Sequence, residues 1–244
     1  MNEIRLENMT WQEADEAVKN ARAVILPLGS TEQHGYHMTL HTDNIVAGWM
    51  ADKLAEKTGC VVMPVLPYGQ VWSAKGFPGT ISLKEDTFIA VVKDIVESIQ
   101  QKGAHNVILF SGHWGNVAPC KIAARELLDE HGYDNVYCLS YMDLKKHGAG
   151  IMESELWNGS GFHAAEIETS VMLAIAPNKV NMDKAVCEYP KAPKDVDIRP
   201  IPWKMFAVSG IFGDATVATK EKGEAFIERW MNDLVALIEG HIHK

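Results

Sequence analysis

The stretch NVILFSGHWGN, residues 106–116, joins a continuously apolar run to a histidine with glycines on both sides. Residues 106–110 show no alternation of apolar and polar side chains, which is typical of a strand covered on both faces. Similar runs occur at 23–28, 60–66 and 135–139. Strands of this kind need a helical layer on each side, so the four runs predict an α/β fold with a mostly parallel sheet.

Helical segments are expected between and after these runs. Thr10 with Glu13, and Ser82 with Glu85, have the spacing of a capping box at the start of a helix. Residues 220–242 have the pattern of a final amphipathic helix. The resulting βαβα order predicts a three-layer αβα sandwich.

Length and composition are those of a soluble globular protein. The chain has 244 residues, 47% hydrophobic and 23% charged, and without a visible linker we expect a single domain over residues 1–244. The formal net charge of −9 argues against a nucleic-acid partner, which needs clustered lysine and arginine. No apolar run reaches the ~18 residues of a membrane span, and no signal-peptide pattern is present. Four cysteines without a CxxC pair fit free thiols, so we expect a cytoplasmic protein without a membrane partner.

Polar residues of the metal-ligand type follow the predicted strands. The segments after the strands are 29–43, 67–80, 111–116 and 140–168. In parallel α/β sheets, ligands bind at the carboxyl ends of the strands, where such loops converge. The functional site is therefore expected where these segments meet.

The first of these segments carries three candidates. Glu32 and His34 are two residues apart, so in an extended backbone their side chains point the same way. Asp43 follows at an expected helix start. Taken singly, Asp43 has an ordinary interpretation as a helix N-cap, and Glu32 and His34 have one as a solvated loop. The alternative is that all three bind metal.

Two later segments add ligand-type residues. The glycines around His113 let the backbone approach a ligand and direct the imidazole. His163 and Glu166 would share one face if a helix begins at residue 162. Carboxylates and imidazoles bind Zn²⁺, Mn²⁺ or Fe²⁺, and a bridging carboxylate lets two cations lie roughly 3.5–4 Å apart. Because several separate loops each carry ligand-type residues, the sequence predicts a site for two divalent cations that activates water.

Several short motifs together resemble the creatininase (creatinine amidohydrolase) family. They are EQHG at 32–35, TD at 42–43, FPGT at 77–80, GHWGN at 112–116 and ETS at 168–170. The resemblance implies a Rossmann-like fold, a hydrolase with a binuclear metal site, a small-molecule substrate, and a homo-oligomer, a hexamer built as a trimer of dimers.

The resemblance also assigns roles to individual residues. It implies that Glu32 and His113 bind one cation, that His34 binds the other and that Asp43 bridges them. His163 matches a histidine that passes protons during ring opening, which an amide needs because its nitrogen leaves poorly unless protonated.

One departure from the family concerns a ligand. Members that hydrolyse creatinine carry a glutamate ligand where this chain has Gly115, and they lack the carboxylate that Glu166 supplies here. We therefore predict Glu166 as a catalytic-site residue and the fifth ligand, on the His34 cation. Glu168 is expected outside the ligand set, because it points about 160° around a helix from Glu166.

A second departure concerns the substrate. Met142 stands where a ring-enclosing tryptophan is expected, and Phe162 replaces a carboxylate, which argues against creatinine. The main prediction is hydrolysis of a C–N bond in a small cyclic amide, lactam or formamide. The alternative is opening of a C–C or lactone bond in a cyclic ketone such as an oxidised inositol. A metal-stabilised scaffold without activity is a third possibility, against which an open site beside a proton donor argues. The predicted substrate contacts are His37, Tyr68, Trp72, Gly79, Trp114, Trp157 and Phe162.

Overall fold

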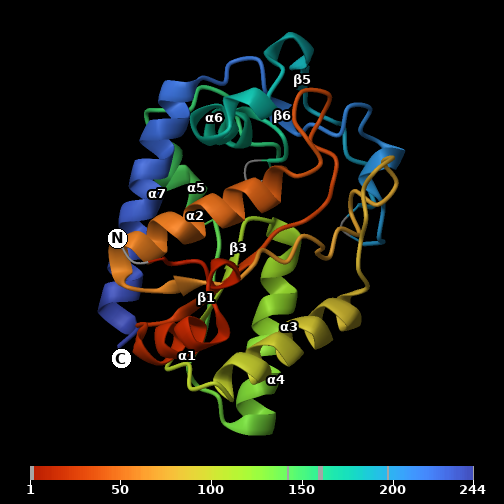
Figure 1. The fold of residues 1–244 in the computed structure, drawn as a ribbon. Coiled ribbons are helices and arrows are strands. Elements are labelled where there is room, and N and C mark those ends of the chain that lie inside the picture. Colours follow the sequence, from red (N-terminus) through yellow and green to blue (C-terminus); the bar gives the residue numbers. More distant parts are fainter. Residues whose placement is uncertain (1–2, 142, 159–161, 197, 244) are drawn as a thin grey trace.

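A four-stranded parallel sheet lies at the centre of the fold (Figure 1). The computed structural model describes residues 3–141, 143–158, 162–196 and 198–243. The strands are β1 (Val24–Leu28), β2 (Val61–Val62), β3 (Val107–Ser111) and β4 (Val136–Leu139), in the order β2-β1-β3-β4. This confirms the predicted α/β fold. β2 is shorter than the expected run, and beyond it the chain returns to β1 through a single bridge between Leu28 and Leu66.

Helices cover both faces of the sheet. Successive strand residues point to opposite faces, so each strand contributes side chains to two cores. Ile25 of β1 packs into the core formed with α2 (Thr42–Thr58), α6 (Glu166–Ile175) and α7 (Lys220–His241). Val24 and Leu26 pack into the other core, with α1 (Trp11–Asn20), α3 (Glu85–Gln100) and α4 (Val117–His131). In Figure 1, α2 and α7 lie on one side of the strands and α3 and α4 on the other. β1, β2 and β3 are buried along their whole length, and apart from Ser111 their residues are apolar, whereas β4 is partly buried.

The remaining elements are short. They are α5 (Leu144–Gly148), the antiparallel pair β5 (Cys187–Glu188) and β6 (Gly213–Asp214), and the 3₁₀ turns η1 (Leu6–Asn8), η2 (Trp114–Asn116), η3 (Pro177–Lys179), η4 (Met182–Lys184) and η5 (Trp203–Met205). Within the described ranges, no helix has the length and apolar character needed to cross a membrane.

The two predicted capping boxes have different outcomes. At α1, the Thr10 side chain accepts from the Glu13 amide and the Glu13 carboxylate accepts from the Thr10 amide, as predicted. The prediction for Ser82 was wrong, because the N-cap of α3 is Lys84, which makes no side-chain cap. The Ser82 hydroxyl instead accepts from the Val71 amide at 2.9 Å. Ser82 therefore ties down the loop that follows β2.

The C-terminal third of the chain returns to the sheet through α7. Trp230 of α7 stacks on Tyr141, with ring centroids 4.3 Å apart, and also contacts Phe110 of β3. The loop after β4 is thereby fixed against the core. Further along the chain, Phe212 donates its backbone N–H to the His163 carbonyl oxygen at 2.9 Å. These contacts bring late segments of the chain to the carboxyl ends of β1 and β3.

Candidate metal centre

A buried cluster of carboxylates and imidazoles lies at the carboxyl ends of the two central strands. Glu32 and His34 come from the loop after β1, Asp43 from the first turn of α2, and His113 from the loop after β3. Each is at most 7% exposed. The cluster thus lies between adjacent strands where an open α/β sheet binds its ligands.

Asp43 lies at the middle of the cluster. Its Oδ1 is 3.1 Å from His34 Nε2 and its Oδ2 is 3.0 Å from His113 Nδ1. The Ser30 hydroxyl donates to Oδ2 at 2.7 Å and so orients the carboxylate. The N-cap of α2 is His41, not Asp43, so the interpretation of Asp43 as a helix cap does not hold.

Backbone carbonyls fix the orientation of each imidazole. His34 Nδ1 faces the Glu32 carbonyl oxygen at 3.2 Å, and His113 Nε2 faces the Gln70 carbonyl oxygen at 2.9 Å. Because a carbonyl can only accept, the facing nitrogen carries a proton, and the other ring nitrogen, which faces the cluster, is the one that would bind a cation after losing its own proton. This is the usual arrangement of metal-binding histidines.

Two atoms of the cluster lack a hydrogen-bond partner although they are buried. They are Glu32 Oε2 and His34 Nε2. A buried polar atom without a partner is costly unless it binds a cation or an ordered water. The donor set therefore fits divalent metal ions.

The pKa values show how the cluster balances its charges without metal. Burial opposes a charged imidazole, but the Asp43 carboxylate outweighs burial and raises the pKa of His34 to about 10. Glu32 and Asp43 likewise overcome burial and raise the pKa of His113 to about 9. Burial raises the pKa of Glu32 and that of Glu168 to about 7. Without metal, protons on the imidazoles and carboxylates thus compensate the buried negative charge, and bound divalent cations would replace these protons.

Two glycines after β3 allow close approach around His113. A Cβ on Gly112 would lie 2.6 Å from the Asp43 carbonyl oxygen, so the loop could not pack against α2. A Cβ on Gly115 would lie 2.4 Å from both His113 Nε2 and the Gln70 carbonyl oxygen. In this backbone, no side chain at position 115 could supply a ligand.

Glu168, and not Glu166, completes the cluster. Glu168 Oε2 lies 3.9 Å from His34 Nε2, and the two group with Asp43 as a potential ligand set. The Ala164 N–H donates to the same oxygen at 2.5 Å, with Ala164 in the left-handed region at φ 52°. This strained residue directs the carboxylate into the cluster.

The structure corrects the prediction for Glu166. Helix α6 begins at Glu166, after His163, so these two residues do not share one helix face. Glu166 and Glu168 are two positions apart and point to opposite sides of the helix. The Glu166 carboxylate contacts Lys222 Nζ at 2.6 Å and lies outside the described ligand groups.

His163 faces the cluster from the cavity side. Its Nε2 is 2.8 Å from the Gln33 carbonyl oxygen, which leaves the Nδ1 lone pair 3.4 Å from Glu32 Oε1 and 4.0 Å from Glu168 Oε2. Burial and the neighbouring His34 charge lower the pKa of His163 to about 3. The imidazole is therefore neutral, with its unprotonated Nδ1 directed toward the two carboxylates.

A cavity of about 340 Å³ opens beside these groups. Its lining residues are Glu32, Ser73, His113, Trp114, Gly115, Tyr141, Trp157, Phe162, His163, Glu168, Trp203 and Phe212. Aromatic contacts connect Trp114 to Phe162 to Tyr141, and Trp157 to Phe212 to Trp203. The cavity has the size and the apolar lining of a small-molecule site, with polar groups at one side.

Three of the predicted substrate contacts line this cavity: Trp114, Trp157 and Phe162. His37, Tyr68, Trp72 and Gly79 do not, and for them the prediction is corrected. His37 is buried against Thr169, with Nε2 2.8 Å from Oγ1. Tyr68 is exposed, Trp72 lies under Lys75, and Gly79 lies under the Leu40 side chain. Met142 lies outside the described residues.

Sequence reasoning missed Phe212, Tyr141 and Ser73 as lining residues, and for Trp203 it left lining and simple packing as alternatives. Trp203 follows a proline-rich stretch and packs 5.0 Å from the His163 ring, centroid to centroid. Its neighbour Phe212 donates its N–H to the His163 carbonyl oxygen. Nothing in the sequence pattern signals that these distant residues surround His163, because only the tertiary fold brings them there.

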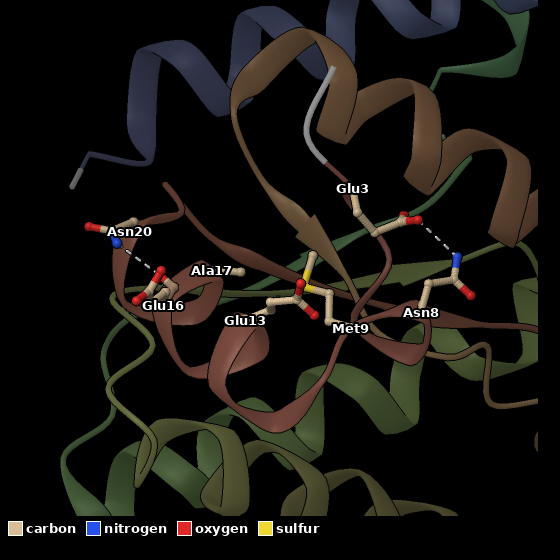
Figure 2. A pocket seen from close by; sticks show the side chains of 7 residues that line it. All are labelled: Glu3, Asn8, Met9, Glu13, Glu16, Ala17 and Asn20. Atoms are coloured by element: carbon tan, nitrogen blue, oxygen red, sulfur yellow. Dashed lines mark hydrogen bonds between the residues drawn. The ribbon is translucent and has the colours of Figure 1, made fainter.

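A second hollow, of about 480 Å³, lies by α1 at the N-terminal end of the chain and has a different character (Figure 2). Two of its acidic side chains have local partners: Glu13 accepts from Thr10, and Glu3 accepts from Asn8, as Figure 2 shows. Its described lining contains no histidine. The described lining of this hollow therefore lacks the imidazole ligands of the metal cluster.

Comparison with known proteins gives consistent matches. The family model described as creatininase, creatinine amidohydrolase, matches residues 7–238. Creatinine amidohydrolase of Pseudomonas putida is 33% identical over 234 residues, covering 90% of each chain. The mycofactocin precursor peptide peptidase of Mycolicibacterium smegmatis is 32% identical and covers 86% of this chain and 81% of its own. The 3-dehydro-scyllo-inosose hydrolase of Thermotoga maritima is 26% identical and covers 96% and 82%.

Solved structures agree with these relatives. A manganese form of creatininase and a zinc–zinc form of a creatininase mutant each superpose with a TM-score of 0.82 at 28% identity, over 99% of both chains. The similarity therefore extends over the whole fold and includes all the segments that form the cluster.

Proposed function

This chain belongs to the creatininase family of metal-dependent hydrolases, and on that premise we propose that it uses two divalent cations to hydrolyse a C–N bond in a small molecule. The proposed substrate class is a cyclic amide, a lactam or a formamide. The candidate metals are Zn²⁺, Mn²⁺ and Fe²⁺, which all accept carboxylate and imidazole ligands. We also propose a cytoplasmic homo-oligomer, a hexamer, as the family resemblance implies.

One observation carries the proposal: the Asp43 carboxylate faces an imidazole on each side. His34 faces Oδ1 and His113 faces Oδ2. Glu168 groups with His34 and Asp43, and Glu32 groups with His113 and Asp43. A carboxylate shared between two such groups would hold both cations through its two oxygens. The assignment is therefore Glu32 and His113 for one metal, His34 and Glu168 for the other, and Asp43 for both.

The roles of the residues follow from their positions. Bound cations would supply a water-derived nucleophile and polarise the scissile carbonyl. His163 lines the cavity with Nδ1 toward Glu32 and Glu168, and it would take a proton at Nδ1 and pass it to the departing nitrogen. The aromatic side chains around the opening exclude water and hold an apolar part of the substrate.

The lining supports a substrate other than creatinine. Phe162 faces the cavity where creatinine-hydrolysing members carry a carboxylate. An apolar group cannot pair with the polar edge of creatinine, so the site is expected to prefer a substrate with an apolar edge.

A second candidate function is opening of a C–C or lactone bond in a small cyclic ketone. It is favoured by the similarity to the inosose hydrolase, which covers 96% of this chain. The same cations would polarise a ketone as they would an amide.

A substrate panel separates the two functions. The protein is loaded with Mn²⁺ or Zn²⁺ and incubated with lactams, formamides, short peptides, lactones and inososes. Release of an amine supports the C–N hydrolase, and new acid without amine supports the alternative. Absence of turnover on every compound with either metal would contradict both.

A further inference from the structure

Glu166 is a buried carboxylate that the proposed chemistry does not use. The residue is 1% exposed, and its Oε1 lies 2.6 Å from Lys222 Nζ on α7. Both of its oxygens accept from the Glu153 N–H, at 3.1 and 3.0 Å, and Oε2 accepts from the Ser154 N–H at 2.7 Å. A carboxylate with three donors around it is charge-balanced and needs no metal.

Lys222 completes this contact from the opposite helix. Its Nζ also lies 3.0 Å from Glu153 Oε1 and donates to the Val217 carbonyl oxygen at 2.7 Å. The side chain is 13% exposed. The ion pair therefore connects α6, α7 and the segment 153–157, three parts of the chain that are separated in sequence.

The segment 153–157 leads directly into the wall of the cavity. Trp157 lines the cavity and packs edge-on against Phe212, with ring centroids 4.8 Å apart. Its Nε1 donates to the Pro190 carbonyl oxygen at 2.7 Å, and Tyr189 Oη donates to the Glu155 carbonyl oxygen at 3.0 Å. Neutral hydrogen bonds thus hold the far end of the segment, and the buried ion pair holds its beginning.

We propose that the Glu166–Lys222 ion pair clamps residues 153–157 against α6 and α7 and thereby sets the position of Trp157 in the cavity. Glu166 is a positioning residue for the substrate wall. The part of this statement that concerns substrate rests on the proposed function, whereas the clamp itself does not. Because Glu166 and Glu168 share one helical turn, the same turn holds the substrate wall on one side and the metal cluster on the other.

The test uses Glu166→Gln and Lys222→Met in the full-length protein. Glutamine keeps the shape of the side chain, but its NH₂ group must face either Lys222 or a backbone N–H, so at least one donor loses its acceptor. Lys220→Met is the matched control, because Lys220 pairs with Glu224 on the same helix and both side chains are 57% exposed.

The first readout is amide hydrogen exchange of the metal-free protein. We expect the amides of Glu153 and Ser154 to exchange at least about tenfold faster in both variants, with β1 and β3 still protected and the control unchanged. The second readout is metal content, which should equal that of the wild type. The third is kinetic: KM should rise while kcat changes little, since Trp157 contacts the substrate and not the reacting atoms.

Each outcome is decisive. Unchanged exchange at residues 153 and 154 in both variants would overturn the clamp, and loss of a cation in Glu166→Gln with unchanged exchange would make Glu166 a ligand after all. If Glu166→Gln does not fold, Lys222→Met gives the same test without altering α6. Failure of the proposed function is a separate event, seen as a loaded wild-type protein that hydrolyses nothing in the panel, and it leaves the exchange result intact.

Discussion

The first turn of α6 separates two regions that each bury a carboxylate, the clamp region around Glu166 and the metal region around Glu168. Glu166 meets Lys222 at 2.6 Å together with two backbone N–H groups. Glu168 meets the Ala164 N–H and two imidazoles, His34 and His163, at 3.9 and 4.0 Å. The two glutamates are two positions apart in sequence, yet their surroundings differ in where the compensating charge comes from.

In the clamp region the chain supplies its own cation. In the metal region the carboxylates of Glu32, Asp43 and Glu168 are buried together, and the groups opposite them are imidazoles, which carry charge only when protonated. Burying charge without compensation is expensive. Among the described residues, no lysine or arginine pairs with Glu32, Asp43 or Glu168. This difference from the Glu166–Lys222 pair supports our proposal that the metal region takes its cations from solution.

The largest effect is expected from Glu168→Gln. An amide at this position is a poorer ligand, so the protein should retain one cation instead of two. Losing one cation removes several kcal/mol of transition-state stabilisation, which lowers kcat/KM by about 10³-fold or more. Metal analysis and steady-state kinetics beside Glu166→Gln provide the comparison. Equal metal content in the two variants would remove the distinction between the two regions.

A second test asks whether His163 belongs to the metal region or acts on substrate. His163→Gln should keep both cations, because all five residues assigned to the metals remain. The variant should lose at least about 100-fold in kcat, the contribution of a positioned acid–base group. If the variant instead loses a cation, His163 is a ligand and the proton must be carried by another group.

Much of the fold was predictable from local patterns. The four apolar runs correspond to β1–β4, and the capping box of Thr10 and Glu13 forms as expected. These features depend on residues within one segment, where periodicity and capping act. Ser82 has the same spacing to Glu85 but bonds to Val71, because a tertiary partner competes for its hydroxyl.

The cluster was predictable only in part. Glu32, His34, Asp43 and His113 come from loops at strand ends, which parallel topology brings together. The choice between Glu166 and Glu168 depended on where α6 begins and on which side of it faces the cluster. A helix beginning at residue 162 was expected, whereas α6 begins at Glu166, after Ala164 in the left-handed region. This later start turns Glu168, and not Glu166, toward the cluster. Phe212 was missed because its contact with His163 spans tens of residues, which no local pattern signals.

A third test measures how the stabilisation by metal depends on pH, because metal binding must displace protons from the histidines of the metal region. The pKa of His34 is raised to about 10 and that of His113 to about 9, so their protonation stabilises the metal-free fold below about pH 6.5 and is lost as pH rises through 9–10. Metal ligands must be deprotonated, so metal affinity should increase about tenfold per pH unit for each proton released. The melting-temperature difference between loaded and metal-free protein should therefore widen as pH rises from about 6 to about 9. A constant difference would show that no proton leaves the cluster.

The smallest effect is expected from Ser30→Ala, which removes the hydroxyl that donates to Asp43 Oδ2 at 2.7 Å. Groups that orient a metal ligand contribute about 10-fold or more to metal affinity, so the variant should lose cations to a chelator at a lower concentration while KM stays the same. Thr58→Val, which removes a buried hydroxyl at the far end of α2, is the control. An unchanged affinity would mean that His34 and His113 alone hold Asp43 in its bridging orientation. The metal region would then need no supporting hydroxyl to orient its carboxylate, and in this respect it would not differ from the clamp region.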